Sequence, residues 1–146
     1  MKKVVTYGLY NNEKSIKDFE KQIQEYIKDY GEWKIVKKFI DYTKNKQCIS
    51  LEKLLNEALE ENIDIILIKN VRQFCQATNY KVDFFIKFFN QKEIEVIFLE
   101  EKISTADAVG RTQIQIIVFM IQSENEMRSK AKRENLSRSY NRKKRI

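Results

Sequence analysis

The sequence has 146 residues, 42% hydrophobic and 12% aromatic, with three glycines and no proline, so it predicts one packed domain and excludes a disordered chain. It contains no histidine and only Gly8, Gly31 and Gly110 as glycines, which excludes histidine-based catalytic triads and glycine-rich phosphate loops, and we expect no metal and no cofactor. The net charge of +7 favours a polyanionic partner.

The first 31 residues predict a strand followed by a helix. Residues 2–10 are rich in β-branched and aromatic side chains, which is typical of a strand. Apolar residues then recur at helical spacing from Ile16 to Tyr30. We expect Ser15 to cap the start of this helix and Gly31 to end it.

The next segment repeats this order. Trp33–Ile40 predicts a second strand that ends at Asp41, and residues 42–49 predict a polar loop. Ser50 is expected to cap a second helix. The apolar face of that helix consists of Leu51, Leu54, Leu55, Ala58 and Leu59.

Two short apolar runs, Ile63–Lys69 and Ile94–Leu99, are typical of strands covered on both faces. Between them, residues 70–78 predict a loop and Tyr80–Gln91 a third helix. Because strands and helices alternate, the chain predicts an α/β fold with a largely parallel sheet of four or five strands. We expect the phenylalanines of the third helix in the core: Phe84, Phe85, Phe88 and Phe89.

A loop at Ser104–Gly110 precedes the longest helical pattern, from about Thr112 to about Asn135. At about 1.5 Å per residue this helix would reach roughly 35 Å. Its first half is apolar nearly all round, so we expect burial there by the core or by a partner's helix. Its second half is polar and is expected to project into solvent. The chain thus divides into a core, 1–111, and a long helix with a basic tail, 112–146.

The excess positive charge lies at the C-terminal end. Residues 128–146 contain nine basic residues and one acid, whereas residues 1–127 contain 19 basic and 20 acidic residues. A near-neutral body with a basic end is typical of a nucleic-acid-binding protein that contacts phosphates. The alternative is a solvated run of charge without such a partner. The predicted DNA contacts are Arg128, Lys130, Lys132, Arg133, Arg138, Arg142, Lys143, Lys144 and Arg145.

The two cysteines, Cys48 and Cys75, both fall in predicted loops. The residues after Met1 form no apolar leader, and no apolar run is long enough to cross a bilayer. We therefore expect a cytoplasmic protein in which both thiols are reduced.

The order of motifs in residues 101–135 resembles the catalytic domain of the serine recombinases, the resolvase and invertase family. Ile103-Ser104-Thr105 and Gly110-Arg111 come before an apolar helix, then Glu124 and a basic helical end, in the order in which the family has them. The resemblance covers essentially residues 1–135. Its further matches are the opening strand, Ser15 with Gln22, Phe39-Ile40-Asp41 and Ile63–Lys69.

The resemblance implies a flavodoxin-like, three-layer core and a long helix that forms a dimer and crosses DNA. In the family, a serine after the first strand attacks a phosphodiester and becomes linked to DNA, and several arginines stabilise the charge on phosphorus. The resemblance also implies a bacterial, phage or plasmid protein of a mobile element, associated with the nucleoid.

The catalytic positions of the family are changed in this chain. The family's strand-end motif falls on residues 6–10, so that Gly8 stands at the arginine position and Tyr10 at the position of the serine nucleophile. The family's D-R-L-G-R loop falls on residues 72–76, and Gln73 and Gln76 stand at its two arginine positions.

Other positions are retained or ambiguous. Asp41 and Glu124 are retained, whereas Asn125 replaces the arginine of the family's E-R pair. Arg72 stands at the position of the family's aspartate. It is a candidate phosphate ligand only if the alignment of this loop with the family shifts. Tyr10 is conceivable as a substitute nucleophile, but we prefer a packed aromatic, because a longer side chain would misplace the oxygen and its arginines are missing.

These changes predict a degenerate serine recombinase that binds DNA without cutting it, with an accessory or regulatory role. We expect a homodimer, or a mixed dimer with an active recombinase of the same mobile element. Two alternatives stay open: an active site-specific recombinase with rearranged residues, and an interaction module that does not bind DNA. The helix-turn-helix domain that usually follows in the family is not expected here, whether the chain is naturally short or shortened.

Overall fold

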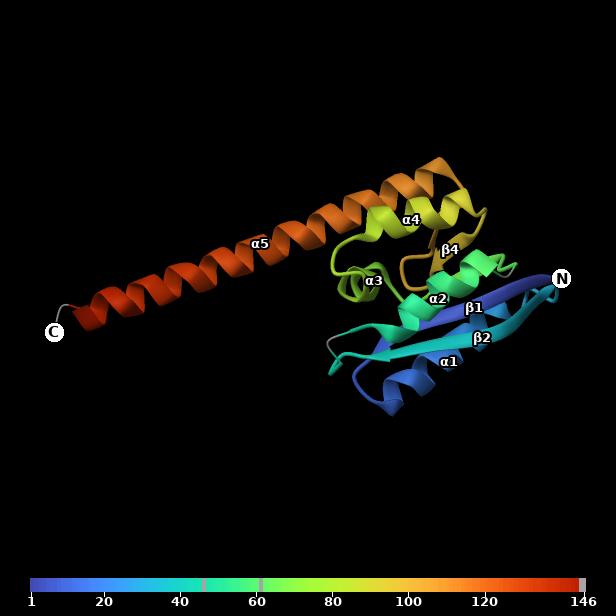
Figure 1. Cartoon of the computed structure of the whole chain (residues 1–146), viewed down its shortest axis with the longest axis horizontal. Helices are drawn as coiled ribbons and strands as arrows, with labels where there is room; N and C mark the ends of the chain where they lie inside the picture. The colour runs from blue at the N-terminus through green and yellow to red at the C-terminus, as the bar shows by residue number, and fades with distance from the viewer. Residues whose placement is uncertain (46, 61, 145–146) are drawn as a thin grey trace.

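Five strands form one sheet in the order β2-β1-β3-β4-β5, and the computed structural model describes residues 1–45, 47–60 and 62–144 (Figure 1). Neighbouring strands run parallel except for β5, which is antiparallel to β4. The predicted, largely parallel sheet is therefore confirmed. The strands are β1 (Lys2–Tyr10), β2 (Trp33–Tyr42), β3 (Ile65–Ile68), β4 (Glu95–Phe98) and β5 (Ile103–Ser104).

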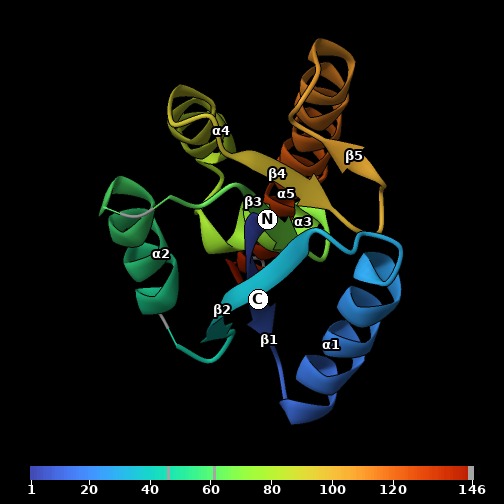
Figure 2. The same cartoon turned by 90° about the vertical axis from the view of Figure 1, so that its right-hand side faces the viewer.

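Helices cover both faces of the sheet, which gives the three layers expected (Figure 2). On one face, α1 (Glu13–Ile27) packs Phe19 and Ile23 against the sheet. The other face packs against four helices, which supply most of the remaining core. These are α2 (Ile49–Glu60), α3 (Val71–Ala77), α4 (Val82–Gln91) and the first part of α5 (Ala108–Lys144).

The predicted helix caps at Ser15 and Ser50 are wrong. The Asn12 side chain caps α1, because its Oδ1 accepts hydrogen bonds from the Ser15 backbone N–H at 2.9 Å and from the Ser15 hydroxyl at 3.0 Å. Ser50 lies inside the first turn of α2, and its hydroxyl donates to the Ile40 carbonyl at 2.6 Å. Both helices begin before the first residue of their apolar repeat, α1 at Glu13 and α2 at Ile49.

Helix α1 ends at Ile27, well before the predicted stop at Gly31. The Tyr30 ring stacks on Trp33 with their centroids 4.3 Å apart and their planes 14° apart. This stacking places Tyr30 in the turn before β2, so its apolar character reflects aromatic packing and not a helical face.

Residues 71–77, expected in a loop, form α3. Its N-cap is Asn70, whose Oδ1 accepts the Gln73 N–H at 2.7 Å. A helix of 7 residues is too short to show a periodic pattern, which is why the sequence did not predict it. Cys75 is therefore a buried helical residue and not a loop residue, and burial raises the pKa of its thiol to about 11. Cys48 lies in a loop as expected, and both thiols are free.

Phe84, predicted in the core, and Leu59, predicted on the apolar face of its helix, are exposed instead. Phe84 is 64% exposed, because α4 buries Val82, Ile86 and Phe89 and Phe84 points to the opposite side of that helix. Leu59 is 56% exposed, since it lies next to the buried Ala58 and is turned about 100° away from it.

Helix α5 is longer at both ends than predicted, running from Ala108 to Lys144, and so begins inside the predicted core segment 1–111. The predicted loop at Ser104–Gly110 is wrong in part, because it contains the end of β5 and the first turn of α5. Asp107 caps this helix: its Oδ1 accepts the Gly110 N–H at 2.6 Å. None of the helices in the described ranges is long and apolar enough to cross a membrane.

Candidate functional site

The end of β1 is filled by an aromatic ring. Tyr10 is only 4% exposed and packs on Phe19 of α1 with ring centroids 6.0 Å apart. A Cβ added to Gly8 would overlap the Tyr10 ring, so the ring lies directly over the glycine. Burial, with a smaller contribution from Glu20, raises the pKa of Tyr10, so its hydroxyl is harder to deprotonate than that of an exposed tyrosine.

Gln73 of α3 reaches the same strand end. Its Oε1 accepts the backbone N–H of Leu9 at 3.3 Å, so the amide satisfies a donor at the end of β1. A guanidinium has donors only, so an arginine at this position does not make this bond. Gln76, the second glutamine predicted at an arginine position of the family, follows on α3 and is exposed. The glutamine at position 73 is thus adapted to the packed strand end.

Asp41 organises a buried network at the end of β2. Its carboxylate accepts three hydrogen bonds: from the Tyr7 hydroxyl at 2.8 Å, from the Ser50 N–H at 2.9 Å and from the Leu51 N–H at 3.1 Å. It therefore caps α2 and ties that helix to β1. Burial and the bond to Asp41 raise the pKa of Tyr7. This aspartate has a structural task, and no local pattern predicted its partner Tyr7, which lies 34 residues away in the sequence.

Glu124 and Asn125 attach α5 to the body. The Glu124 Oε2 lies 3.1 Å from the Nη2 of Arg72 on α3. The Asn125 Nδ2 donates to the hydroxyl of Tyr80, a residue of the turn between α3 and α4 that we did not predict as a site residue. These two side-chain contacts lie where α5 leaves the body.

The predicted site positions thus fall into separate groups. Gly8, Tyr10 and Gln73 meet at the end of β1, whereas Asp41 belongs to the α2 cap. The remaining retained or changed positions, Arg72, Glu124 and Asn125, lie at the junction with α5.

The body is poor in guanidinium groups. Residues 1–127 contain only two arginines, Arg72 and Arg111. Arg111 donates from Nη1 to the Thr105 carbonyl at 2.8 Å, and Arg72 pairs with Glu124. Both are engaged by groups on α5 or the loop before it. Among the described residues, no three His, Cys, Asp or Glu side chains are grouped to hold a metal ion.

Beyond Asn125, α5 projects from the body (Figure 1). Arg128 and Lys132 follow Asn125 after three and seven residues, so they continue the side of the helix on which Asn125 contacts the body. Arg145 lies outside the described residues, as do the side chains of Arg142, Lys143 and Lys144. The structure describes the side chains of five residues that we predict to contact DNA, and all five are exposed: Arg128, Lys130, Lys132, Arg133 and Arg138.

The first half of α5 carries two apolar stripes on opposite sides. The inner stripe, Ile114, Val118 and Ile121, is buried in the core. The outer stripe has a spacing of seven, four and seven residues, which keeps it on one side of the helix. Burial of this half is therefore confirmed on one side only. The outer stripe consists of Val109, Ile116, Met120 and Met127, each more than half exposed.

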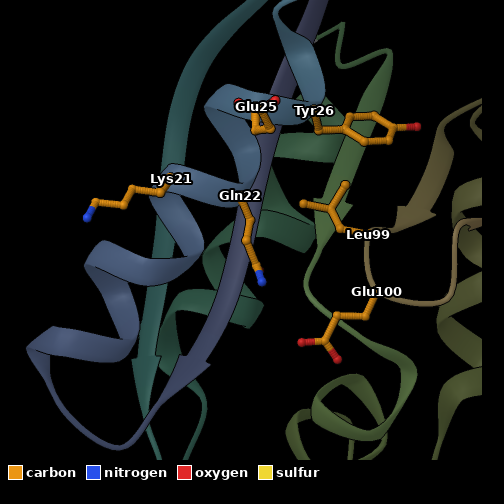
Figure 3. Close-up of a pocket in the computed structure, with 6 residues that line it drawn as sticks. All are labelled: Lys21, Gln22, Glu25, Tyr26, Leu99 and Glu100. Atoms are coloured by element: carbon orange, nitrogen blue, oxygen red, sulfur yellow. The ribbon is translucent and has the colours of Figure 1, made fainter.

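A shallow cavity lies beside α1, on the side of the sheet that also holds Tyr10. Figure 3 shows Gln22 of α1 and Leu99 after β4 at this cavity, which Lys21 also lines. Glu100, also at the cavity, lies 3.8 Å from the Nζ of Lys69. This lining offers no group of cations for a phosphate.

Comparison with known proteins agrees with this fold. The family model described as "Resolvase, N terminal domain" matches residues 9–145. No curated protein matches the sequence. The N-terminal catalytic domain of TP901-1 integrase is 20% identical with a TM-score of 0.65, over 86% of this chain and 98% of that one.

Two further solved structures are similar. A resolvase family site-specific recombinase from Streptococcus pneumoniae is 12% identical with a TM-score of 0.63, over 94% of this chain and 99% of that one. The C-terminal catalytic domain of ISC1926 TnpA, an IS607-like serine recombinase, is 16% identical with a TM-score of 0.54, over 82% and 99%. Given the family match over residues 9–145, together with this fold, the chain belongs to the serine recombinase family, as a resolvase-type catalytic domain of the site-specific recombination class.

Proposed function

We propose that this chain binds DNA without cutting it. The observation that carries the proposal is the state of the nucleophile position, where a buried Tyr10 lies over Gly8. A nucleophile must be exposed to its substrate and easily deprotonated. Tyr10 is neither, because it is buried and its pKa is raised.

The surroundings of Tyr10 support the same conclusion. Phosphoryl transfer depends on positive groups that stabilise charge on the phosphorus, and removing one such group costs orders of magnitude in rate. Here Gly8, Gln73 and Gln76 stand at arginine positions of the family. An arginine at position 8 would displace the Tyr10 ring, and an arginine at position 73 would leave the Leu9 N–H without its acceptor. Restoring cleavage therefore requires several coupled changes.

The projecting half of α5 is the proposed DNA-binding surface. Arg128 and Lys132 continue the body-facing side of the helix, so a duplex that contacts them lies against this side of α5. Contacts of this kind go to phosphates, so they give affinity that falls with salt and little preference for sequence.

Neutralising two basic residues of α5 tests this surface. We expect the double variant Arg128→Gln/Lys132→Gln to bind a DNA duplex more weakly and to reduce the slope of log K against log salt by roughly 1.8, about 0.9 for each lost contact. Fluorescence anisotropy at several salt concentrations measures both. The matched control, Lys17→Gln/Lys21→Gln on α1, removes two exposed lysines at the same spacing and should leave the slope unchanged. Equal salt slopes for the wild type and both double variants would rule out this surface as the DNA-binding one.

We also propose that the chain forms a homodimer through the outer stripe of α5. Val109 and Met127 are separated by 18 residues, so the stripe extends over about 27 Å. Four large apolar side chains on one side of a helix bury little by themselves, and a second helix with the same stripe would cover them.

Sedimentation velocity tests the dimer. We expect the wild type to sediment at about twice its 17.6 kDa monomer mass and Ile116→Asp to sediment as a monomer, because the aspartate places a charge in the seam. Ser129→Asp introduces the same charge on the opposite, exposed side of α5 and should remain dimeric. A wild-type monomer at micromolar concentration would exclude this interface.

An accessory role follows from these two surfaces. A chain with a dimer seam and a DNA-binding helix, but without a nucleophile, can pair with an active recombinase and occupy one half of a recombination site. The mixed dimer then has a single active subunit. We propose such a regulator of an active recombinase from the same mobile element, acting on the nucleoid. An intact recombinase gene beside this one would support the role.

A further inference from the structure

The turn between α3 and α4 has an unusual backbone conformation. Asn79 and Tyr80 are consecutive residues with φ of 51° and 63°, in the left-handed region that residues other than glycine rarely adopt. The turn lies between two buried residues, Thr78 after α3 and Val82 at the start of α4. The Tyr80 N–H donates to the Cys75 carbonyl at 2.8 Å, which ties the turn back to α3. The surroundings therefore hold the backbone at Tyr80 in one strained conformation.

The Tyr80 side chain reaches from this turn to α5. Its hydroxyl accepts a hydrogen bond from the Nδ2 of the half-buried Asn125, and Tyr80 itself is 37% exposed. Ile121, one helical turn earlier, is the last buried residue of α5 among those whose side chains the structure describes. The contact with Tyr80 thus lies just beyond the end of the core packing, where the helix begins to project (Figure 1).

The ion pair of Arg72 with Glu124 joins the same part of α5 to the body. This pair is half exposed, and its long side chains lose much rotational freedom when they meet, so it restrains the helix weakly. The side chains of Tyr80 and Asn125 have fewer rotatable bonds, and the backbone at Tyr80 is held in place. Their contact therefore restrains the direction of the helix more strongly than the ion pair does.

The direction of α5 at Asn125 determines where the basic residues of the projecting half lie. Arg138 follows Asn125 by 13 residues, which corresponds to about 20 Å along the helix. A tilt of about 15° at Asn125 would move Arg138 by about 5 Å, which is longer than a hydrogen bond to a phosphate oxygen. A small change of direction is thus enough to separate Arg138 from a phosphate that it contacts.

We propose that Tyr80 is a positioning residue, which holds α5 through Asn125 in the direction that DNA binding requires. This inference rests on the proposed function, since it requires DNA along the basic half of α5. Without the contact, the helix samples several directions, and the apparent affinity for DNA falls with the fraction of molecules in the competent one. The phosphate contacts in the final complex stay the same, so the salt dependence of binding is unchanged.

Removal of one hydroxyl group in Tyr80→Phe tests this role with a plain DNA duplex as the probe. By fluorescence anisotropy we expect Tyr80→Phe to bind about fivefold more weakly than the wild type, with the same slope of log K against log salt. Asn125→Ala should have the same effect, and the double variant should lose no more than either single variant, because all three remove one contact. The control Tyr30→Phe removes the hydroxyl of a tyrosine of similar exposure, 43%, in the turn before β2, and should bind like the wild type.

Two further variants separate the direction of α5 from the stability of the turn. Tyr80→Gly and Tyr80→Ala both remove the contact with Asn125, but only glycine adopts the left-handed backbone without strain. We expect Tyr80→Gly to have the higher Tm of the two, and both to bind DNA as weakly as Tyr80→Phe. Affinity that rises and falls with Tm among these variants would assign Tyr80 a purely structural role and overturn the proposal.

The remaining outcomes separate this inference from the proposed function. Wild-type affinity in Tyr80→Phe, or additive losses in the double variant with Asn125→Ala, would overturn the positioning role. A smaller salt slope in Tyr80→Phe would overturn it too, because Tyr80 would then contact a phosphate directly. If the wild type binds DNA no better than Arg128→Gln/Lys132→Gln, the proposed function itself fails. Circular dichroism of each variant verifies the fold.

Discussion

Replacing Asp41 with alanine is expected to destabilise the protein by about 4 kcal/mol. The substitution removes the acceptor of three hydrogen bonds, two of them from the first turn of α2 and one from the buried Tyr7 hydroxyl. Each buried donor left without an acceptor costs roughly 1–3 kcal/mol. Urea unfolding followed by circular dichroism gives the change as a shift in the midpoint at constant m-value.

Asp64→Ala is the matched control for this prediction. The Asp64 Oδ2 also accepts a backbone N–H, that of Lys3 at 2.7 Å, but this bond is exposed. Water replaces a lost acceptor at an exposed site, so the cost should stay at or below about 1 kcal/mol. Similar losses for the two alanine variants would show that Asp41 does not hold α2 and β1 together, and its retention would then need another explanation.

A single methyl group at Gly110 is expected to destabilise the protein by about 3 kcal/mol or more. Gly110 is buried in the first turn of α5, where a Cβ would overlap the carbonyl oxygen of Ser104 and stand 3.0 Å from its carbon. The atoms it meets belong to the backbone of β5, so no side-chain rotation relieves the clash. Gly110→Ala must therefore shift either α5 or β5, and thermal unfolding would show a lower Tm.

Gly31→Ala provides the contrast. A Cβ at Gly31 meets nothing within 4 Å, and the residue lies in an exposed turn. Alanine there should change the free energy of unfolding by no more than about 0.5 kcal/mol. If Gly110→Ala is tolerated as well as Gly31→Ala, the close approach of α5 to Ser104 is wrong.

Much of the fold follows from local patterns in the sequence. The apolar runs at Ile63–Lys69 and Ile94–Leu99 contain β3 and β4, because a strand covered on both faces has almost no polar positions. The errors come from side-chain contacts that local sequence patterns do not reveal. Asp41 caps a helix that Ser50 was expected to cap, and Tyr30, expected on a helical face, stacks on Trp33 after the first helix has ended.

The family was predictable from the sequence, but the side-chain contacts at the candidate site were not. The motif order identified the family, whereas the assignment of Gly8 and Tyr10 to its catalytic positions stays a prediction. The sequence did not reveal that the Tyr10 ring lies on Gly8, or that Gln73 accepts the Leu9 N–H, because both depend on side-chain directions in the packed state. The pairing of Arg72 with Glu124, 52 residues apart, was hidden for the same reason.

The most direct measurement is a search for a covalent protein–DNA link on supercoiled plasmid that carries the DNA flanking this gene. At low salt we expect the plasmid to be retarded by the protein and, after detergent, to be recovered supercoiled with no protein attached. Cleaved strands joined to the protein would contradict a packed, unreactive strand end. Loss of that link in Tyr10→Phe would identify the phenol as the attacking group.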